Sequence, residues 1–125
     1  MAECRVLVVD DDPSIRETLA EVLDLEGYPV ETARNGAEAL ACVERRMPHL
    51  ILLDMRMPVL DGWGFARTFR ERYGNVRAIV VMTAARDARS WCREIGAEHC
   101  LPKPFDLLEV LEVAEQLCAE AAYMG

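Results

Sequence analysis

Carboxylates follow two of the most apolar runs in this sequence. Val6-Leu7-Val8-Val9 ends in Asp10-Asp11-Asp12, and Leu50-Ile51-Leu52-Leu53 ends in Asp54. Clustered carboxylates resist ionisation, and a divalent cation relieves their repulsion. An incomplete cage of hard oxygen ligands favours Mg²⁺, which keeps several waters and binds through one or two carboxylates and a phosphate. One such carboxylate can also act as a nucleophile, because aspartyl phosphates are established covalent intermediates.

Two further polar side chains stand at comparable positions. Thr83 follows the apolar run that ends at Met82, and Lys103 lies just past a short run that ends at Leu101. Phosphoryl transfer chiefly requires positioning and neutralisation of charge on the equatorial oxygens, which a hydroxyl donor and an ammonium beside Asp54 would supply. Lys103 is the only lysine among the 14 cationic side chains. The alternative is that Asp54 merely ends a strand in solvent.

The elements that must position these residues alternate regularly. Short β-rich runs are separated by segments with helical periodicity, and Asp12, Asn35, Asp87 and Asp106 stand where helix caps are expected. Asp61-Gly62 is a turn former. The strands are predicted over about 5–9, 28–33, 50–54, 77–82 and 97–101, and the helices over about 13–27, 35–46, 63–73, 87–96 and 106–120, with 121–125 frayed.

This alternation predicts an α/β fold with a doubly wound parallel sheet. For five strands the flavodoxin-like (βα)5 order 2-1-3-4-5 is the natural choice, and it makes the first and third strands neighbours, roughly 4.8 Å apart. Asp10, Asp11 and Asp54 then meet at the switch point. Thr83 and Lys103 fall on the same edge of the sheet.

Size and charge restrict the class of protein. A chain of 125 residues predicts one domain, 1–125, and the net charge of -8 argues against direct binding to nucleic acid or to anionic lipid. No apolar run approaches the roughly 20 residues of a membrane span, and the start lacks the build of a signal peptide. A cytoplasmic protein is expected.

The five cysteines are predicted to be small core residues in a reducing compartment. No pair has the CxxC spacing of a metal or redox motif, and the count is odd. Neither a disulfide framework nor a zinc site is therefore expected. They are Cys4, Cys42, Cys92, Cys100 and Cys118.

Five short segments stand in order at the predicted strand ends and turns: Val8-Val9-Asp10-Asp11-Asp12-Pro13, Leu52-Leu53-Asp54-Met55-Arg56-Met57-Pro58, Asp61-Gly62, Thr83-Ala84 and Lys103-Pro104-Phe105. In this order they resemble the receiver domain of two-component response regulators, in the CheY-like superfamily. Asn35–Leu40 and Gly96-Ala97 are also similar to the family. The resemblance covers about residues 4–118.

The resemblance implies a phosphorelay signalling domain that catalyses only its own phosphorylation and dephosphorylation. Asp54 would accept a phosphoryl group from a histidine kinase or a histidine phosphotransfer protein. Asp10, Asp11, Asp54 and the backbone carbonyl of Arg56 would hold Mg²⁺. Thr83 and Lys103 would contact the phosphoryl oxygens, and Lys103-Pro104 is expected to be a cis peptide.

The resemblance also implies a partner surface that changes on phosphorylation. It is formed by the fourth helix, the fifth strand and the last helix, and it is a candidate homodimer interface. Trp63 and Trp91 are predicted to be packing residues.

One position departs from the family pattern. Many receivers have an aromatic residue three before the lysine, whereas this chain has Cys100. An alternative is therefore an interaction module with a receiver fold that works without phosphorylation. A hydrolase at the same edge would need a second acid just after Asp54, but Met55 and Arg56 occupy those positions. A flavin site is disfavoured because, without a metal, the acids would repel the phosphate of a flavin nucleotide.

Overall fold

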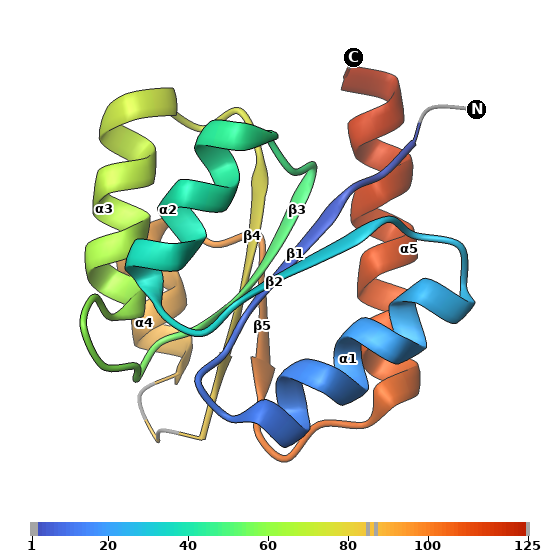
Figure 1. Cartoon of the computed structure of the whole chain (residues 1–125), viewed down its shortest axis with the longest axis horizontal. Helices are drawn as coiled ribbons and strands as arrows, with labels where there is room; N and C mark the ends of the chain where they lie inside the picture. Colours follow the sequence, from blue (N-terminus) through green and yellow to red (C-terminus); the bar gives the residue numbers. More distant parts are fainter. Residues whose placement is uncertain (1–2, 85, 87, 125) are drawn as a thin grey trace.

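The computed structural model describes residues 3–84, 86 and 88–124 of the chain. Along these residues five β-strands alternate with five α-helices (Figure 1). The strands are β1 (Val6–Val9), β2 (Val30–Ala33), β3 (Leu50–Asp54), β4 (Ala78–Thr83) and β5 (His99–Pro102). The helices are α1 (Pro13–Leu25), α2 (Gly36–Arg45), α3 (Gly62–Tyr73), α4 (Ala88–Ile95) and α5 (Leu107–Met124).

These strands form one parallel sheet in the order β2-β1-β3-β4-β5. Helices α1 and α5 cover one face of the sheet, and α2, α3 and α4 cover the other (Figure 1). The predicted doubly wound fold and strand order are confirmed. Val9 pairs with Leu53, and Leu53 pairs with Val81, so β1, β3 and β4 end at a common edge.

The two central strands β1 and β3 are buried on both faces. This follows from their uninterrupted apolar sequences, because successive side chains in a strand point to opposite faces of the sheet. One set packs with α2, α3 and α4: Leu7, Val9, Ile51 and Leu53. The other set packs with α1 and α5: Val6, Val8, Leu50 and Leu52. The residues that follow these strands are therefore carried on the most constrained part of the fold.

Polar residues begin the helices, largely as predicted. Asp12, Asn35 and Asp106 each accept a backbone N–H from the first turn of the helix that follows. Asp61, expected only in a turn, also caps a helix, because its Oδ1 accepts the N–H of Gly64 at 2.8 Å. The predicted cap Asp87 lies outside the described residues.

The predicted element bounds agree with the structure to within two residues, except at the end of the last helix. Strand β5 begins at His99 and not at residue 97, because the N–H of Ile79 is taken by the Glu98 carboxylate at 2.6 Å and strand pairing starts one residue later. Helix α5 continues to Met124, past the predicted end at residue 120, and the fraying of 121–125 stays a prediction. Neither α5 nor any other helix in the described ranges is long and apolar enough to cross a membrane.

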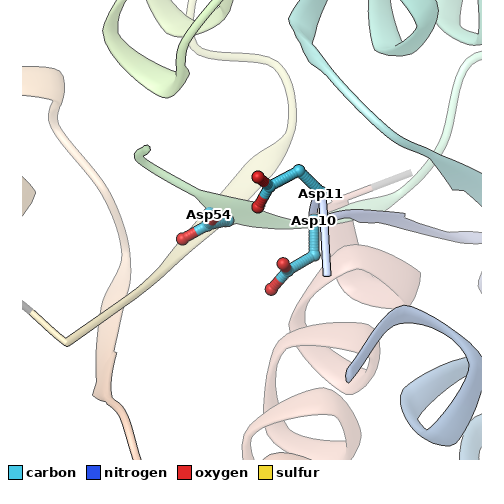
Figure 2. Close-up of side chains that lie close together, drawn as sticks. All are labelled: Asp10, Asp11 and Asp54. Carbon is cyan, nitrogen blue, oxygen red and sulfur yellow. The ribbon is translucent and has the colours of Figure 1, made fainter. Parts of the chain in front are cut away.

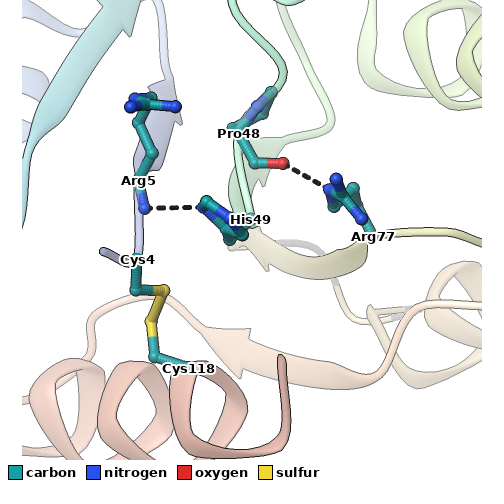
Figure 3. The surroundings of a disulfide bond; sticks show 6 residues. All are labelled: Cys4, Arg5, Pro48, His49, Arg77 and Cys118. Atoms are coloured by element: carbon teal, nitrogen blue, oxygen red, sulfur yellow. Dashed lines mark hydrogen bonds between the residues drawn. A yellow bond between two sulfur atoms is a disulfide. The ribbon is translucent and has the colours of Figure 1, made fainter. Parts of the chain in front are cut away.

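A disulfide joins Cys4 to Cys118 (Figure 3). The prediction that all five cysteines are free is therefore wrong for this pair. Cys4 precedes β1 and Cys118 lies on α5, whose packing brings the two Cα atoms to 5.7 Å across a sequence separation of 114. That separation of Cα atoms is within the range disulfides require. Cys42 and Cys92 are free and buried, and Cys100 is free and half-buried, as small apolar residues would be.

Hydrogen bonds secure the same end of the sheet. The N–H of Arg5 donates to Nδ1 of His49 at 3.0 Å (Figure 3), and the N–H of His49 donates to the carbonyl of Arg5 at 2.8 Å. Burial lowers the pKa of His49, and the charges of Arg77 and Arg5 lower it further, so the imidazole stays a neutral acceptor. The start of β1 is thus tied both to α5 and to the segment before β3.

Candidate phosphoacceptor and metal site

Three aspartates converge at the carboxyl edge of the sheet. Asp10 and Asp11 follow β1, and Asp54 ends the neighbouring strand β3. Their carboxylates each offer one oxygen that lies within 4.8 Å of the others (Figure 2). Asp10 is fully buried and Asp54 is buried, whereas Asp11 is exposed. The structure therefore brings together the acids that the strand ends predicted.

The Lys103 ammonium meets two of these acids. Its Nζ donates to Oδ2 of Asp10 at 2.9 Å and to Oδ1 of Asp54 at 3.3 Å. The backbone N–H of Lys103 donates to the carbonyl of Thr83 at 2.8 Å, which aligns the segment after β5 with the end of β4. The peptide between Lys103 and Pro104 is cis, as the resemblance implied.

A cavity of about 380 Å³ opens beside Asp54. Its lining residues are Asp54, Arg56, Thr83, Ala84 and Lys103. Thr83 is 2% exposed, so its side chain is held in place at the end of β4. The cavity is many times larger than the roughly 30 Å³ that one water occupies in the liquid, which leaves room for a tetrahedral anion. The predicted hydroxyl and ammonium therefore border the same space as the predicted nucleophile.

Burial and like charge perturb this site. Burial and, after it, the charge of Asp10 raise the pKa of Asp54, Lys103 opposes both, and the net result is a pKa of about 6. Burial alone would lower the pKa of Lys103, but the hydrogen bond and charge of Asp10, with those of Asp54, raise it above its ordinary value. The site thus holds more negative charge than one ammonium compensates.

Asp54→Asn is expected to stabilise the metal-free protein at neutral pH. The folded state holds a proton on Asp54 more tightly than the unfolded chain does, since the pKa rises from 3.8 to about 6. Stability is therefore lost as the pH rises through this window. A tenfold change in proton affinity is about 1.4 kcal/mol, so the variant should gain about 3 kcal/mol at pH 7.5.

The measurement is urea unfolding in a chelator at several pH values. The gain from Asp54→Asn should shrink as the pH falls and approach zero only below the unfolded-state pKa of 3.8, where Asp54 is protonated in both states. A gain that is absent at pH 7.5, or that is independent of pH, contradicts this electrostatic account.

The loop after β3 is held close to the site by its glycine. The N–H of Gly62 donates to the carbonyl of Met55 at 3.0 Å. A Cβ at Gly62 would lie 2.7 Å from the Asp54 carbonyl oxygen, so a side chain cannot be accommodated there without displacing the end of β3. Asp61-Gly62 therefore both caps α3 and allows the loop to fold back onto Asp54.

Val59→Gly is expected to stabilise the protein by about 0.5–1 kcal/mol. Val59 has a φ of 69° and is 83% exposed, so the β-branched side chain is strained and packs little. Relief of the left-handed conformation, about 1–2 kcal/mol, exceeds the entropic cost of glycine. Chemical denaturation measures the change, with exposed Val76→Gly as a control that should destabilise. An unchanged or lower stability for Val59→Gly would show that the loop tolerates valine.

Aromatic contacts extend the site toward α3 and α4. The guanidinium carbon of Arg56 lies 5.4 Å from the centre of the Trp91 ring. The Trp91 and Trp63 rings meet at a centroid separation of 4.4 Å and an interplanar angle of 70°. Both tryptophans pack, as predicted, but their link to Arg56 was not foreseen. No spacing in the sequence marks it, because Arg56 follows β3 and Trp91 lies on α4 in the next βα unit.

The donor set fits a hard divalent cation. Three carboxylates present oxygens at mutual distances that one ion can share, and Mg²⁺ prefers oxygen ligands. Burial and the neighbouring charge of Asp10 both disfavour the ionised form of Asp54, and a bound cation would favour that form. Asp10, Asp11 and Asp54 would supply the carboxylates. The contribution of the Arg56 backbone carbonyl stays a prediction.

The sequence profile described as "Response regulator receiver domain" matches residues 6–115. The chain therefore belongs to the response regulator receiver domain family. It is 44% identical over 110 residues to Response regulator MprA of Mycobacterium sp. (strain KMS), and this match covers 86% of the chain and 47% of the relative. The match to Response regulator MprA of Mycobacterium leprae (strain TN) has the same values. The chain thus spans about half the length of these curated relatives.

Solved structures agree with this assignment. Chemotaxis protein CheY4 of Vibrio cholerae superposes with a TM-score of 0.84 at 32% identity, covering 93% of this chain and 99% of that one. A CheY-like response regulator receiver domain protein from Methanospirillum hungatei JF-1 gives a TM-score of 0.89 at 25% identity, covering 99% of this chain and 100% of that one. The chain is accordingly a signalling domain of the two-component type.

Proposed function

We propose that this chain is a phosphoacceptor in a two-component system. Asp54 receives a phosphoryl group from the phosphohistidine of a histidine kinase or a histidine phosphotransfer protein, in a Mg²⁺-dependent reaction. The observation that carries the proposal is the contact of Lys103 Nζ with both Asp10 and Asp54 at the edge where three carboxylates meet. Thr83 supports the proposal as well, because it lines the same cavity as Asp54 and Lys103.

The chain's own groups account for the transfer. A carboxylate oxygen of Asp54 attacks phosphorus, a P–O bond forms, and the P–N bond to the donor imidazole breaks with its electron pair returning to nitrogen. Lys103 neutralises charge on a phosphoryl oxygen, and the Thr83 hydroxyl donates to another. Mg²⁺ bound by the acids would neutralise developing negative charge on the phosphoryl oxygens. Asp10 and Asp11 would serve to hold that ion.

Intact-mass measurement tests the proposal. The protein is incubated with Mg²⁺ and acetyl phosphate, and one phosphoryl group should be added to the wild type and none to Asp54→Asn. Asp24→Asn, at an exposed aspartate of α1, is the matched control and should be modified like the wild type. No adduct on the wild type, or an equal adduct on Asp54→Asn, overturns the proposal.

The broader setting follows from the same proposal. The chain would act in the cytoplasm as a receiver domain over 1–125. It would control an effector domain or protein through the surface formed by α4, β5 and α5, and the same surface is the proposed homodimer interface. The acidic net charge of -8 disfavours direct contact of this chain with nucleic acid. Sedimentation velocity with and without acetyl phosphate tests the dimer. The protein should sediment as a dimer only when it is phosphorylated.

A second candidate is an interaction module that does not need phosphorylation. Cys100 favours it, because this half-buried residue of β5 packs against the cluster under α2, α3 and α4 without an aromatic ring to change position. Partner affinity discriminates between the two functions. Affinity that is equal for the phosphorylated protein and Asp54→Asn supports the module, and affinity that changes with phosphorylation supports the receiver function.

A further inference from the structure

A chain of side-chain contacts leads from the site to α4. Arg56 lines the same cavity as Asp54, Thr83 and Lys103, and its guanidinium also lies over Trp91 on α4, at 5.4 Å from the ring centre. That distance is within the roughly 6 Å of a cation–π contact. Trp91 in turn meets Trp63 of α3 at 4.4 Å.

Helix α4 is short and buries few of its residues. It spans eight residues, and within the described residues only Ala88 and Cys92 of this helix are buried. Trp91 and Ile95 are half-buried against the cluster shared with α2 and α3. A helix of two turns is marginal without tertiary packing, so the contacts of Trp91 add to the packing of Cys92 and Ile95 that holds α4 in place.

A phosphoryl group on Asp54 would compete with Trp91 for the same cation. It places a charge of about -1.5 to -2 and three acceptor oxygens in the cavity that Arg56 lines, in exchange for the single charge of the Asp54 carboxylate. Hydrogen bonds from guanidinium to a phosphoryl group are charge-assisted and can be bidentate, and they are stronger than an exposed cation–π contact. Arg56 is exposed, so its side chain has room to turn.

We propose that Arg56 is the residue that transmits phosphorylation to α4, by exchanging its Trp91 contact for the phosphoryl group on Asp54. This rests on the proposed function of Asp54. The unphosphorylated state keeps α4 docked through Arg56, Trp91 and Trp63. The phosphorylated state withdraws the guanidinium and loosens α4, which lies on the proposed partner surface.

Hydrogen exchange of the α4 backbone, followed by mass spectrometry, tests the proposal. In wild type, Mg²⁺ with acetyl phosphate should speed exchange in α4 by about two- to fivefold, the Boltzmann equivalent of one exposed cation–π contact. Arg56→Gln should show the faster exchange without any phosphodonor. Arg89→Gln removes an exposed cation of α4 itself and should behave as wild type. The Trp91→Leu variant should still accept the phosphoryl group, but phosphorylation should cause no further change in the hydrogen exchange of its α4 backbone.

Intact mass on the same samples separates the two proposals. Full phosphorylation with unchanged α4 exchange, or an Arg56→Gln variant that exchanges like wild type, overturns the role of Arg56 and leaves Asp54 as acceptor. Absence of a phosphoryl adduct overturns both. A second readout is Trp63→Phe, in which Trp91 is the only indole, since the chain has two tryptophans. Its emission should change on phosphorylation, and a constant emission contradicts the proposed exchange of partners.

Discussion

Lys103→Met should destabilise the metal-free protein by about 3–5 kcal/mol. The substitution removes the ammonium that lies 2.9 Å from Asp10, whose carboxylate is fully buried, and 3.3 Å from Asp54. Removing one partner of a buried ion pair leaves an uncompensated charge, which costs far more than the net contribution of the pair. Methionine keeps the apolar stem of lysine, so lost packing adds little.

Urea denaturation in a chelator measures this effect. Lys103→Arg is the matched control, because it keeps the positive charge and should retain much of the stability. Added Mg²⁺ should restore part of the loss in Lys103→Met, since a ligand that binds only the folded state stabilises it. A loss below about 1 kcal/mol, the size of an exposed ion pair, would contradict the assignment of Lys103 to a buried charge cluster.

Cys118→Ser is expected to cost about 4–5 kcal/mol under non-reducing conditions. The disulfide to Cys4 closes a loop with a sequence separation of 114, and the chain-entropy model predicts about 4.7 kcal/mol for a loop of 100 residues. The bond also anchors the segment before β1 to α5. The physical effect is mainly on the unfolded chain, whose freedom the cross-link restricts.

Thermal unfolding with and without a thiol reductant provides the check. Reductant should lower the melting temperature of wild type toward that of Cys118→Ser, and it should leave Cys4→Ser unchanged. Wild type that unfolds at the same temperature in both conditions would show that the bond adds no stability. Equal sensitivity of Cys4→Ser to reductant would assign the effect to another cysteine.

Most of the fold could be predicted because its signals are local. Apolar runs such as Leu50–Leu53 are too short for buried helices, and they are too continuous for strands with one face in solvent. Because these strands alternate regularly with helices, a parallel sheet covered on both faces is the expected arrangement. The site followed from the fold, since carboxyl ends of adjacent parallel strands share an edge. Asp10 and Asp54 therefore needed only the correct strand order to be placed together.

The features that were missed depend on how helices pack. Cys4 and Cys118 meet because α5 lies across the start of β1, and no spacing between them carries that information. The approach of Arg56 to Trp91 depends likewise on the position of α4. The odd number of cysteines and the expected reducing compartment predict no disulfide, because that is the usual outcome for such proteins. A single pair of cysteines that the fold brings together is enough to make this prediction wrong.

Peptide mapping of the phosphorylated protein tests the central claim most directly. Borohydride reduces an aspartyl phosphate to homoserine, and tandem mass spectrometry then locates the reduced residue. After incubation with Mg²⁺ and acetyl phosphate, homoserine is expected at position 54 alone, and none is expected when a chelator replaces Mg²⁺. Homoserine at another aspartate, or equal labelling in the chelator, would contradict a magnesium-dependent acceptor at Asp54.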